Sequence, residues 1–214
     1  MLEDNESHRG LRNRLIEQLR TKGIEDEQVL HAMSKVPRHL FMDSTFLKFA
    51  YADQAFPIAS GQTISQPYTV AVQTSLLEVT PHLKILEVGT GSGYQAAVLA
   101  TMGARVYSVE RIHHLHQTSK SLLSQLSIQV RLFYGDGYAG LPAFAPFDRI
   151  LITAAIPELQ EELTRQLRKG GILVMPEGDR GSQIMKKIRR TGEDEFISST
   201  HGNFVFVPMI KGTE

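Results

Sequence analysis

The chain has 214 residues, 42% of them apolar, which is enough for one substantial domain with a hydrophobic core. Lysine plus arginine and aspartate plus glutamate number 23 each, so the chain lacks the basic excess that a large nucleic-acid interface requires. It has no cysteine, which excludes disulfides, zinc sites built from thiolates and a cysteine nucleophile. Residues 1–10 are too polar for a secretory signal, and no apolar run is long enough for a membrane span. We therefore expect a monomeric cytoplasmic protein with neither nucleic acid nor a membrane as partner.

Residues 11–36 have the apolar spacing of two amphipathic helices, with leucines recurring every four residues in the first. Asp26 is placed to cap the second helix and Pro37 to end it. Residues 37–66 show no regular period, but their aromatic side chains argue against disorder, so we expect this irregular segment to be functional. Pro67 begins another helix, because proline is favoured in the first helical turn.

From residue 84 onward, short apolar runs alternate with helical patterns. Strands are predicted at Lys84–Val88, Arg105–Val109, Gln129–Tyr134, Phe147–Thr153 and Gly171–Pro176, and helices at Tyr94–Met102, Ile112–Gln125 and Pro157–Leu167. This alternation indicates βαβ units and a mostly parallel, doubly wound sheet. Two further strands, Ser182–Arg190 and Asn203–Ile210, flank a predicted turn at 191–194, and at least one of them should close the sheet in the antiparallel direction. The predicted fold class is therefore α/β, with N-terminal helices and a doubly wound, Rossmann-like sheet of seven strands.

The most informative segment is the loop Gly89-Thr90-Gly91-Ser92-Gly93, which follows the first predicted strand and precedes a helix. Its glycines let the backbone approach a ligand without clashes from Cβ atoms. A dinucleotide site would have the spacing Gly-x-Gly-x-x-Gly, whereas here the third glycine comes one residue earlier. Together with Glu87 just before the loop, this spacing favours a nucleoside that carries a cationic amino acid, and S-adenosylmethionine fits that description.

The ends of the next two strands carry groups that suit the same ligand, and ligands of doubly wound sheets bind outside the carboxyl ends of the strands. Glu110 ends the second strand, where its carboxylate can accept hydrogen bonds from ribose hydroxyls. Asp136 lies between two glycines at the end of the third strand and suits the exocyclic amine of adenine. Each signal is weak alone, since acidic residues after strands are often helix caps. Three successive strand ends with nucleoside-compatible groups favour a binding site.

A second candidate site is the polar loop from Ile58 to Pro67, just before a predicted helix. The free N–H groups of a helix N-terminus attract anions, and the hydroxyl groups of the loop would help to bind a carboxylate. The alternative is that Ser65 only caps the helix, and the residues alone do not separate the two interpretations.

Two other clusters have simpler explanations. His113 and His116 are spaced to share a helix face, but no carboxylate nearby completes a metal site, so we expect a solvated face and no metal. The basic residues of Lys186–Arg190 are expected to lie on an exposed edge strand, where charge discourages aggregation, rather than to bind phosphate.

The chain resembles the protein-L-isoaspartate O-methyltransferases, a family of enzymes that use S-adenosylmethionine. The resemblance runs from Val36-Pro37-Arg38 to Phe206-Val207-Pro208, and its most specific part is Gly61-Gln62-Thr63-Ile64-Ser65-Gln66-Pro67-Tyr68. Other matching segments are Glu87 with the glycine loop, Gly135-Asp136-Gly137, Ala145-Pro146-Phe147-Asp148 and Gly170-Gly171. The chain departs from the family pattern at Ala59, where glycine is usual, and at Ser60.

The resemblance implies an enzyme that methylates the free α-carboxylate of L-isoaspartyl residues in damaged proteins and peptides, which starts repair through a succinimide. It places the active-site serine at Ser65. The residues that it implies for cofactor binding are Gln62, Thr63, Ile64, Glu87, Gly89, Thr90, Gly91, Ser92, Gly93, Glu110, Arg111, Asp136 and Gly137. It further implies one methyltransferase domain over 1–214, with helices and the active-site loop in 1–66, the cofactor-binding core in 67–176 and closing strands in 177–214.

An α-carboxylate, with a pKa of about 3.5, is already ionised at neutral pH, so the reaction requires no strong general base. A neutral hydroxyl suits this chemistry better than an arginine clamp, because very strong hydrogen bonds would quench the nucleophile. Two rival functions remain: a methyltransferase for RNA or a small molecule on the same fold, and a non-catalytic nucleoside-binding protein. The neutral charge and the Gly61–Tyr68 segment count against RNA, and Ser65 with the complete strand ends counts against the second rival.

Overall fold

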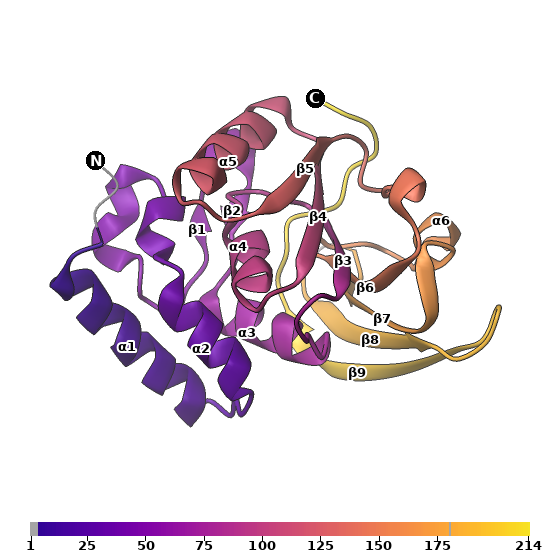
Figure 1. Ribbon diagram of the computed structural model, residues 1–214, viewed down its shortest axis with the longest axis horizontal. Helices are drawn as coiled ribbons and strands as arrows, with labels where there is room; N and C mark the ends of the chain where they lie inside the picture. Colours follow the sequence, from indigo (N-terminus) through magenta and orange to yellow (C-terminus); the bar gives the residue numbers. More distant parts are fainter. Residues whose placement is uncertain (1–3, 180) are drawn as a thin grey trace.

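A computed structural model describes residues 4–179 and 181–214; the first three residues of the polar N-terminal segment lie outside that description. Seven strands form one sheet in the order β5-β4-β3-β6-β7-β8-β9 (Figure 1). The strands that pair in parallel are β3 (Lys84–Val88), β4 (Arg105–Glu110), β5 (Val130–Tyr134), β6 (Phe147–Ile152) and β7 (Leu167–Glu177). The antiparallel strands are β8 (Gln183–Arg190) and β9 (Phe196–Phe204). This arrangement confirms the predicted α/β, doubly wound fold with seven strands.

Apart from the last, the helices fall where the apolar periodicity predicts them. They are α1 (Glu6–Thr21), α2 (Glu27–Lys35), α3 (Pro67–Leu76), α4 (Tyr94–Thr101), α5 (His113–Gln125) and the short α6 (Glu161–Thr164). Asp26 caps α2 as expected, because its carboxylate accepts hydrogen bonds from the N–H groups of Gln28 and Val29. In the described part of the chain, no helix combines the length and the apolar character needed to cross a membrane.

The two faces of the sheet are covered by different elements. Alternate residues of a strand point to opposite faces, so Ile85 and Leu86 of β3 enter separate apolar clusters. The cluster around Ile85 includes residues of α4 and lies against the helices, and α1 and α2 form a further layer outside α4 (Figure 1). The opposite cluster, around Leu86, is closed by the segment between β5 and β6 and by α6. The strand ends between these two layers are left open for a site.

The irregular segment 37–66 contains short elements that sequence periodicity cannot show. They are the 3-10 turns η1 (Arg38–Phe41), η2 (Ser44–Phe49) and η3 (Ala59–Gly61), and an antiparallel pair, β1 (Phe56–Pro57) with β2 (Thr63–Ile64). The hairpin presents residues 62–65 directly before α3, so the irregular segment is ordered and carries the candidate active-site loop.

Two predicted elements are wrong. The helix expected at Pro157–Leu167 shrinks to the four residues of α6, because β7 already begins at Leu167. The last strand lies at Phe196–Phe204 and not at Asn203–Ile210, because it pairs with β8 directly after the tight turn at residues 191–195. The apolar run that suggested a strand leaves the sheet instead: Val205 is 79% exposed, and residues 207–210 line a cavity.

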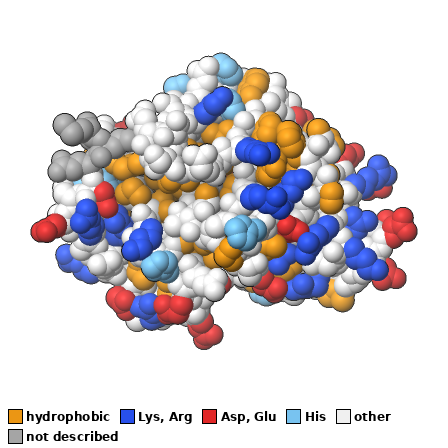
Figure 2. All heavy atoms as spheres, viewed as in Figure 1, with side chains coloured by type: hydrophobic (Ala, Val, Ile, Leu, Met, Phe, Trp, Pro, Cys, Tyr) orange, Lys and Arg blue, Asp and Glu red, His pale blue; other side chains and the backbone are white. Residues whose placement is uncertain are grey.

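The basic residues of β8 also differ from expectation, since β8 lies between β7 and β9 and is not an edge strand. Lys187 and Arg189 both form ion pairs with Glu78, and Lys186 pairs with Glu177. Arg190 donates hydrogen bonds to main-chain carbonyls. These cations are therefore engaged within the protein, and the face drawn in Figure 2 carries both signs of charge around its rim.

Candidate functional site

A cavity opens at the carboxyl ends of β3, β4 and β6, where the strand order reverses. It encloses about 640 Å³ of space when the open solvent at its mouth is included. The predicted residues that line it are Gln62, Thr63, Gly89, Gly91, Glu110, Arg111 and Gly137. Its apolar walls come from residues that the sequence did not single out: Val88, Val109, Ile112 and the segment 207–210. Apolar walls with one carboxylate, that of Glu110, suit an adenosine group, so the cavity fits the predicted S-adenosylmethionine.

Gly89 is required by the geometry of this cavity. Its φ of 96° lies in the left-handed region, and a Cβ atom there would come within 2.5 Å of the Thr153 hydroxyl oxygen. That hydroxyl, at the end of β6, donates a hydrogen bond to the Gly89 carbonyl at 2.6 Å. The ends of β3 and β6 are thus joined so closely that only glycine fits between them.

Glu110 is held rigidly at the wall of the cavity. Its Oε2 atom accepts a hydrogen bond from the Gly91 N–H at 2.8 Å, and its Oε1 atom accepts one from the Ile112 N–H at 2.9 Å. Each carboxylate oxygen has a second lone pair, so both can still accept a ribose hydroxyl. The side chain is 4% exposed, which means that its orientation is set before any ligand arrives.

Asp136 does not itself line the cavity, although the adjacent Gly137 does, and it binds the chain's last residues. Its Oδ1 atom accepts a hydrogen bond from the Tyr138 N–H at 2.9 Å, and its Oδ2 atom accepts one from the Gly212 N–H at 2.8 Å. Glu214 continues this contact, because its backbone N–H donates to the Arg111 carbonyl at 2.8 Å. Residues 205–214 therefore run across the strand ends as a strap over the cavity (Figure 1).

Two predicted cofactor residues, the last glycine of the loop and the glutamate before it, do not line the cavity wall. Gly93, with a φ of 88°, is the N-cap of α4 and packs against Leu123. Glu87 is fully buried, and one of its carboxylate oxygens accepts a hydrogen bond from the Ser108 hydroxyl. Burial raises the pKa of Glu87 to about 8, which makes the neutral acid the main form at pH 7. Gly93 therefore ends the loop at the start of α4, and Glu87 supports it from the buried end of β3.

A small polar chamber and an open groove adjoin the cofactor cavity. The chamber is lined by Ile64, Thr90 and Ser92 from the predicted set, and also by Tyr94 and Gln95. The groove runs between the active-site loop and the end of β9, with walls from residues 65–69 and 203–207. Ser65 lines both the chamber and the groove, and Thr63 lines all three spaces.

The N-terminus of α3 is capped from a distance. Its N-cap residue, Gln66, makes no capping bond through its side chain, and Ser65 does not cap the helix either. The carboxylate of Asp53 instead accepts a hydrogen bond from the Tyr68 N–H at 2.8 Å. The helix N-terminus therefore already holds an acidic side chain. That this helix N-terminus also binds a substrate carboxylate stays a prediction, while Ser65, which does not cap the helix, lines the chamber and the groove.

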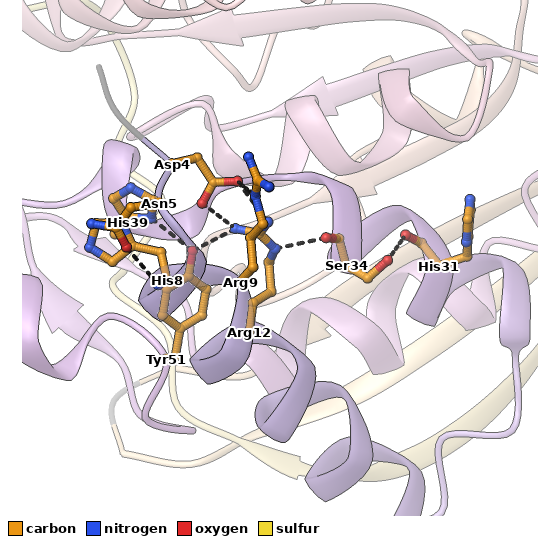
Figure 3. A network of polar contacts seen from close by, with 9 residues as sticks. All are labelled: Asp4, Asn5, His8, Arg9, Arg12, His31, Ser34, His39 and Tyr51. Carbon is orange, nitrogen blue, oxygen red and sulfur yellow. Dashed lines mark hydrogen bonds and ion pairs between the residues drawn. The ribbon is translucent and has the colours of Figure 1, made fainter. Parts of the chain in front are cut away.

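Asp4, His8 and His39 form the one group of three potential metal ligands among the described residues (Figure 3). Arg12 donates two hydrogen bonds to the Asp4 carboxylate, at 3.0 and 2.8 Å. These bonds hold the pKa of Asp4 below its usual value. The His8 and His39 rings stack with centroids 3.8 Å apart. A guanidinium beside the carboxylate opposes a cation, and we assign the cluster to anchoring α1 through Tyr51.

The histidines of α5 occupy a surface position away from this cluster. His113 is exposed, and His116 is half-buried; both rings pack against Tyr134. Burial holds the pKa of His116 below its usual value. These contacts explain the two side chains without a metal ion.

A glycine-rich turn after β3, a carboxylate after β4 and the seven-stranded order with an antiparallel closing pair define the class of S-adenosylmethionine-dependent methyltransferases. The model of the family described as protein-L-isoaspartate(D-aspartate) O-methyltransferase matches residues 10–214. A protein-L-isoaspartate O-methyltransferase of Cytophaga hutchinsonii is 51% identical over 209 residues, which are 98% of this chain and 95% of the relative. The chain therefore belongs to this family, which confirms the resemblance predicted from the sequence.

Solved structures agree with this assignment. One described as a protein-L-isoaspartate O-methyltransferase superposes with a TM-score of 0.84 at 26% identity; the match covers 92% of this chain and 65% of that one. A second, from Plasmodium falciparum and in complex with S-adenosyl-L-homocysteine, has a TM-score of 0.82 at 26% identity and covers 98% of this chain and 100% of that one. The protein is thus a methyltransferase enzyme, and its cofactor is S-adenosylmethionine, as predicted.

Proposed function

We propose that this protein transfers a methyl group to the free α-carboxylate of L-isoaspartyl residues in damaged proteins and peptides, with Ser65 positioning that carboxylate. The observation that carries the proposal is the place of Ser65, which lines both the polar chamber beside the glycine loop and the open groove. A side chain at that junction can contact an acceptor that enters from the groove. S-adenosylmethionine supplies a methyl group on a sulfonium, which the acceptor oxygen takes as the carbon–sulfur bond breaks and neutral S-adenosylhomocysteine leaves.

The residues around the junction suit a nucleophile that is already charged. The Ser65 hydroxyl can donate one hydrogen bond to a carboxylate oxygen and leave the other oxygen free. Catalysis then depends on orientation and on removal of water from the attacking oxygen. No general base has to take a proton, because the carboxylate is ionised at neutral pH.

The groove supports a substrate that is recognised by its backbone. Its walls include the exposed Val205, together with Tyr68 and Phe204, whose rings lie 6.4 Å apart and stack at 16°. An open, partly apolar groove accepts an extended peptide without selecting for charge. We propose a matching division of the chain: the N-terminal helices and active-site loop in 1–66, the cofactor-binding core in 67–176 and the groove's outer wall in 177–214. The monomeric state, the cytoplasmic location and the lack of a nucleic-acid partner stay predictions.

Matched aspartyl and isoaspartyl peptides with methyl-labelled S-adenosylmethionine provide the test. The expected result is a base-labile methyl ester on the isoaspartyl peptide alone. Equal labelling of both peptides would contradict recognition of the misplaced carboxylate. Labelling of neither peptide, with methyl transfer to RNA or to a small molecule, would favour one of the rival substrates on the same fold.

A further inference from the structure

Arg38 is completely buried beneath the active-site loop, although it carries a charge. Its Nε atom donates a hydrogen bond to the Ala50 carbonyl at 3.1 Å, and its Nη2 atom donates one to the Ser65 carbonyl at 2.8 Å. A longer contact, 3.4 Å, joins Nη2 to the Gln54 carbonyl. One side chain thus ties the segment after η2 to the residue that we propose as the active-site serine.

The same guanidinium also contacts the cofactor side of the site. Its central carbon lies 4.9 Å from the centre of the Tyr94 ring, a favourable arrangement of a cation over an aromatic face. Tyr94 is the first residue of α4 and directly follows the glycine loop. It is itself buried and lines the polar chamber. Arg38 therefore links the loop that carries Ser65 to the helix that begins at the cofactor loop.

The burial of this cation is costly for folding. The acceptors of its hydrogen bonds are neutral carbonyls, and its Nη1 atom is buried without a hydrogen-bond partner among the described residues. Burial lowers the pKa of Arg38 to about 10, so the side chain still carries its charge at pH 7. A buried charge is weak support for stability, since an apolar side chain of similar size often stabilises a fold as well or better. The arrangement points to a role other than stability.

We propose that Arg38 is a positioning residue for methyl transfer, which acts by fixing the Ser65 backbone relative to Tyr94. The inference rests on the proposed role of Ser65. Arg38 is not among the residues that line the chamber or the groove, so it acts through its neighbours and not by touching the acceptor. The guanidinium is needed for its fork of donors, because the single ammonium group of lysine cannot reach all three carbonyls.

Arg149 offers a matched control at the other end of α3. It is also buried, and it donates hydrogen bonds to the carbonyls of Leu77, the C-cap of α3, and of Asp148 and Glu78. It lies on β6 and does not line the chamber or the groove. Arg38→Lys and Arg149→Lys should therefore lose similar stability, measured as the urea midpoint, but should differ in catalysis.

We expect Arg38→Lys to lower kcat at least tenfold at saturating peptide and cofactor, with the calorimetric Kd for S-adenosylmethionine changed less than threefold. Arg149→Lys should keep kcat within twofold of the parent. Equal kcat values for the two variants would overturn the inference, and so would a loss of cofactor affinity that accounts for the whole effect of Arg38→Lys. If Arg38→Lys does not fold, Tyr94→Leu removes the other half of the contact and should lower kcat by a similar factor; an unchanged kcat there would overturn the inference.

A double-mutant cycle with Ser65→Ala separates this inference from the proposed function. If Arg38 acts through Ser65, adding Arg38→Lys to Ser65→Ala should lower kcat less than threefold further. Losses that multiply would show that Arg38 acts independently and would overturn the inference while leaving Ser65 in place. A Ser65→Ala variant with the parent's kcat would contradict the proposed role of Ser65 and remove the inference with it.

Discussion

The carboxylate of Asp53 accepts a hydrogen bond from the Tyr68 N–H at 2.8 Å, so a residue fifteen positions earlier caps the helix that follows the active-site loop. The Asp53 side chain is 2% exposed and also pairs with Lys22 at 2.6 Å. Its backbone carbonyl accepts a hydrogen bond from the Gln66 side chain at 3.0 Å. The residues that directly follow Ser65 are therefore held by the segment around residue 53.

Asp53→Ala should cost about 1–2 kcal/mol of stability, the usual effect of losing a helix cap, and should lower turnover because α3 no longer fixes the loop. Chemical denaturation and peptide methylation measure the two effects. Lys22→Ala is the control: it removes the half-exposed partner of the ion pair, which is worth no more than about 1 kcal/mol, and leaves the capping carboxylate in place. Equal losses in the two variants would assign the effect to the ion pair and not to the cap.

Ser65→Ala should lower kcat on an isoaspartyl peptide more than tenfold, because the acceptor carboxylate loses the hydroxyl proposed to orient it. The Kd for S-adenosylmethionine, measured by calorimetry, should change little. Ser121→Ala, which removes an exposed hydroxyl on α5, should leave both values as they are. Unaltered turnover in Ser65→Ala would refute the proposed role.

Asp136→Ala should weaken cofactor binding at least tenfold, because the carboxylate proposed to meet the adenine amine is lost. The same change also frees the Gly212 N–H and loosens the strap at residues 205–214. Glu214→Gln provides the matched control, since it weakens the ion pair with Arg111 and leaves Asp136 intact. Similar affinities in the two variants would show that the strap, and not the carboxylate, determines binding.

Gly89→Ala should lower cofactor affinity at least tenfold and destabilise the fold, because the new Cβ atom would clash with the Thr153 hydroxyl at a positive φ. Gly10→Ala in α1 is the control, as nothing lies within 4 Å of a Cβ atom there. That change should stabilise the protein by roughly 0.5–1 kcal/mol, the usual gain from replacing a helical glycine. A Gly89→Ala variant with normal affinity would contradict the close approach of β3 and β6.

Glu87 should make stability depend on pH. Because burial raises its pKa from 4.5 to about 8, the folded protein holds a proton in that interval which the unfolded chain releases. The free energy of unfolding should therefore fall as the pH rises from about 5 to 8, by at most about 1.4 kcal/mol per pH unit from this one group. Glu87→Gln keeps a neutral side chain at every pH. Its free energy of unfolding should therefore exceed that of the parent by a growing margin as the pH rises from about 5 to 8. Parallel urea midpoints for the two proteins at pH 5.5, 7 and 8.5 would contradict the shift.

The strands of the core were predictable because each is a short buried run with a turn signal at its end. Lys84–Val88 was located from the sequence without error, and Glu110 was correctly placed at a strand end. The segment 203–210 misled for the same reason, since an apolar run that walls a cavity has the composition of a buried strand. An apolar pattern in the sequence indicates that side chains are shielded from water, but it does not show whether a sheet or a ligand cavity shields them.

The sequence by itself determined the alternation of strands and helices in the core, the glycine loop and the family, because these depend on neighbouring residues and on motif spacing. Only the tertiary structure decided how Ser65 is held. Arg38 reaches its carbonyl across 27 positions, and Asp53 caps α3 across 15. Only the fold brings such distant residues together, after loop-closure entropy has been overcome, so no local pattern records the contact. The same holds for the strap, whose Gly212 meets Asp136 across 76 positions.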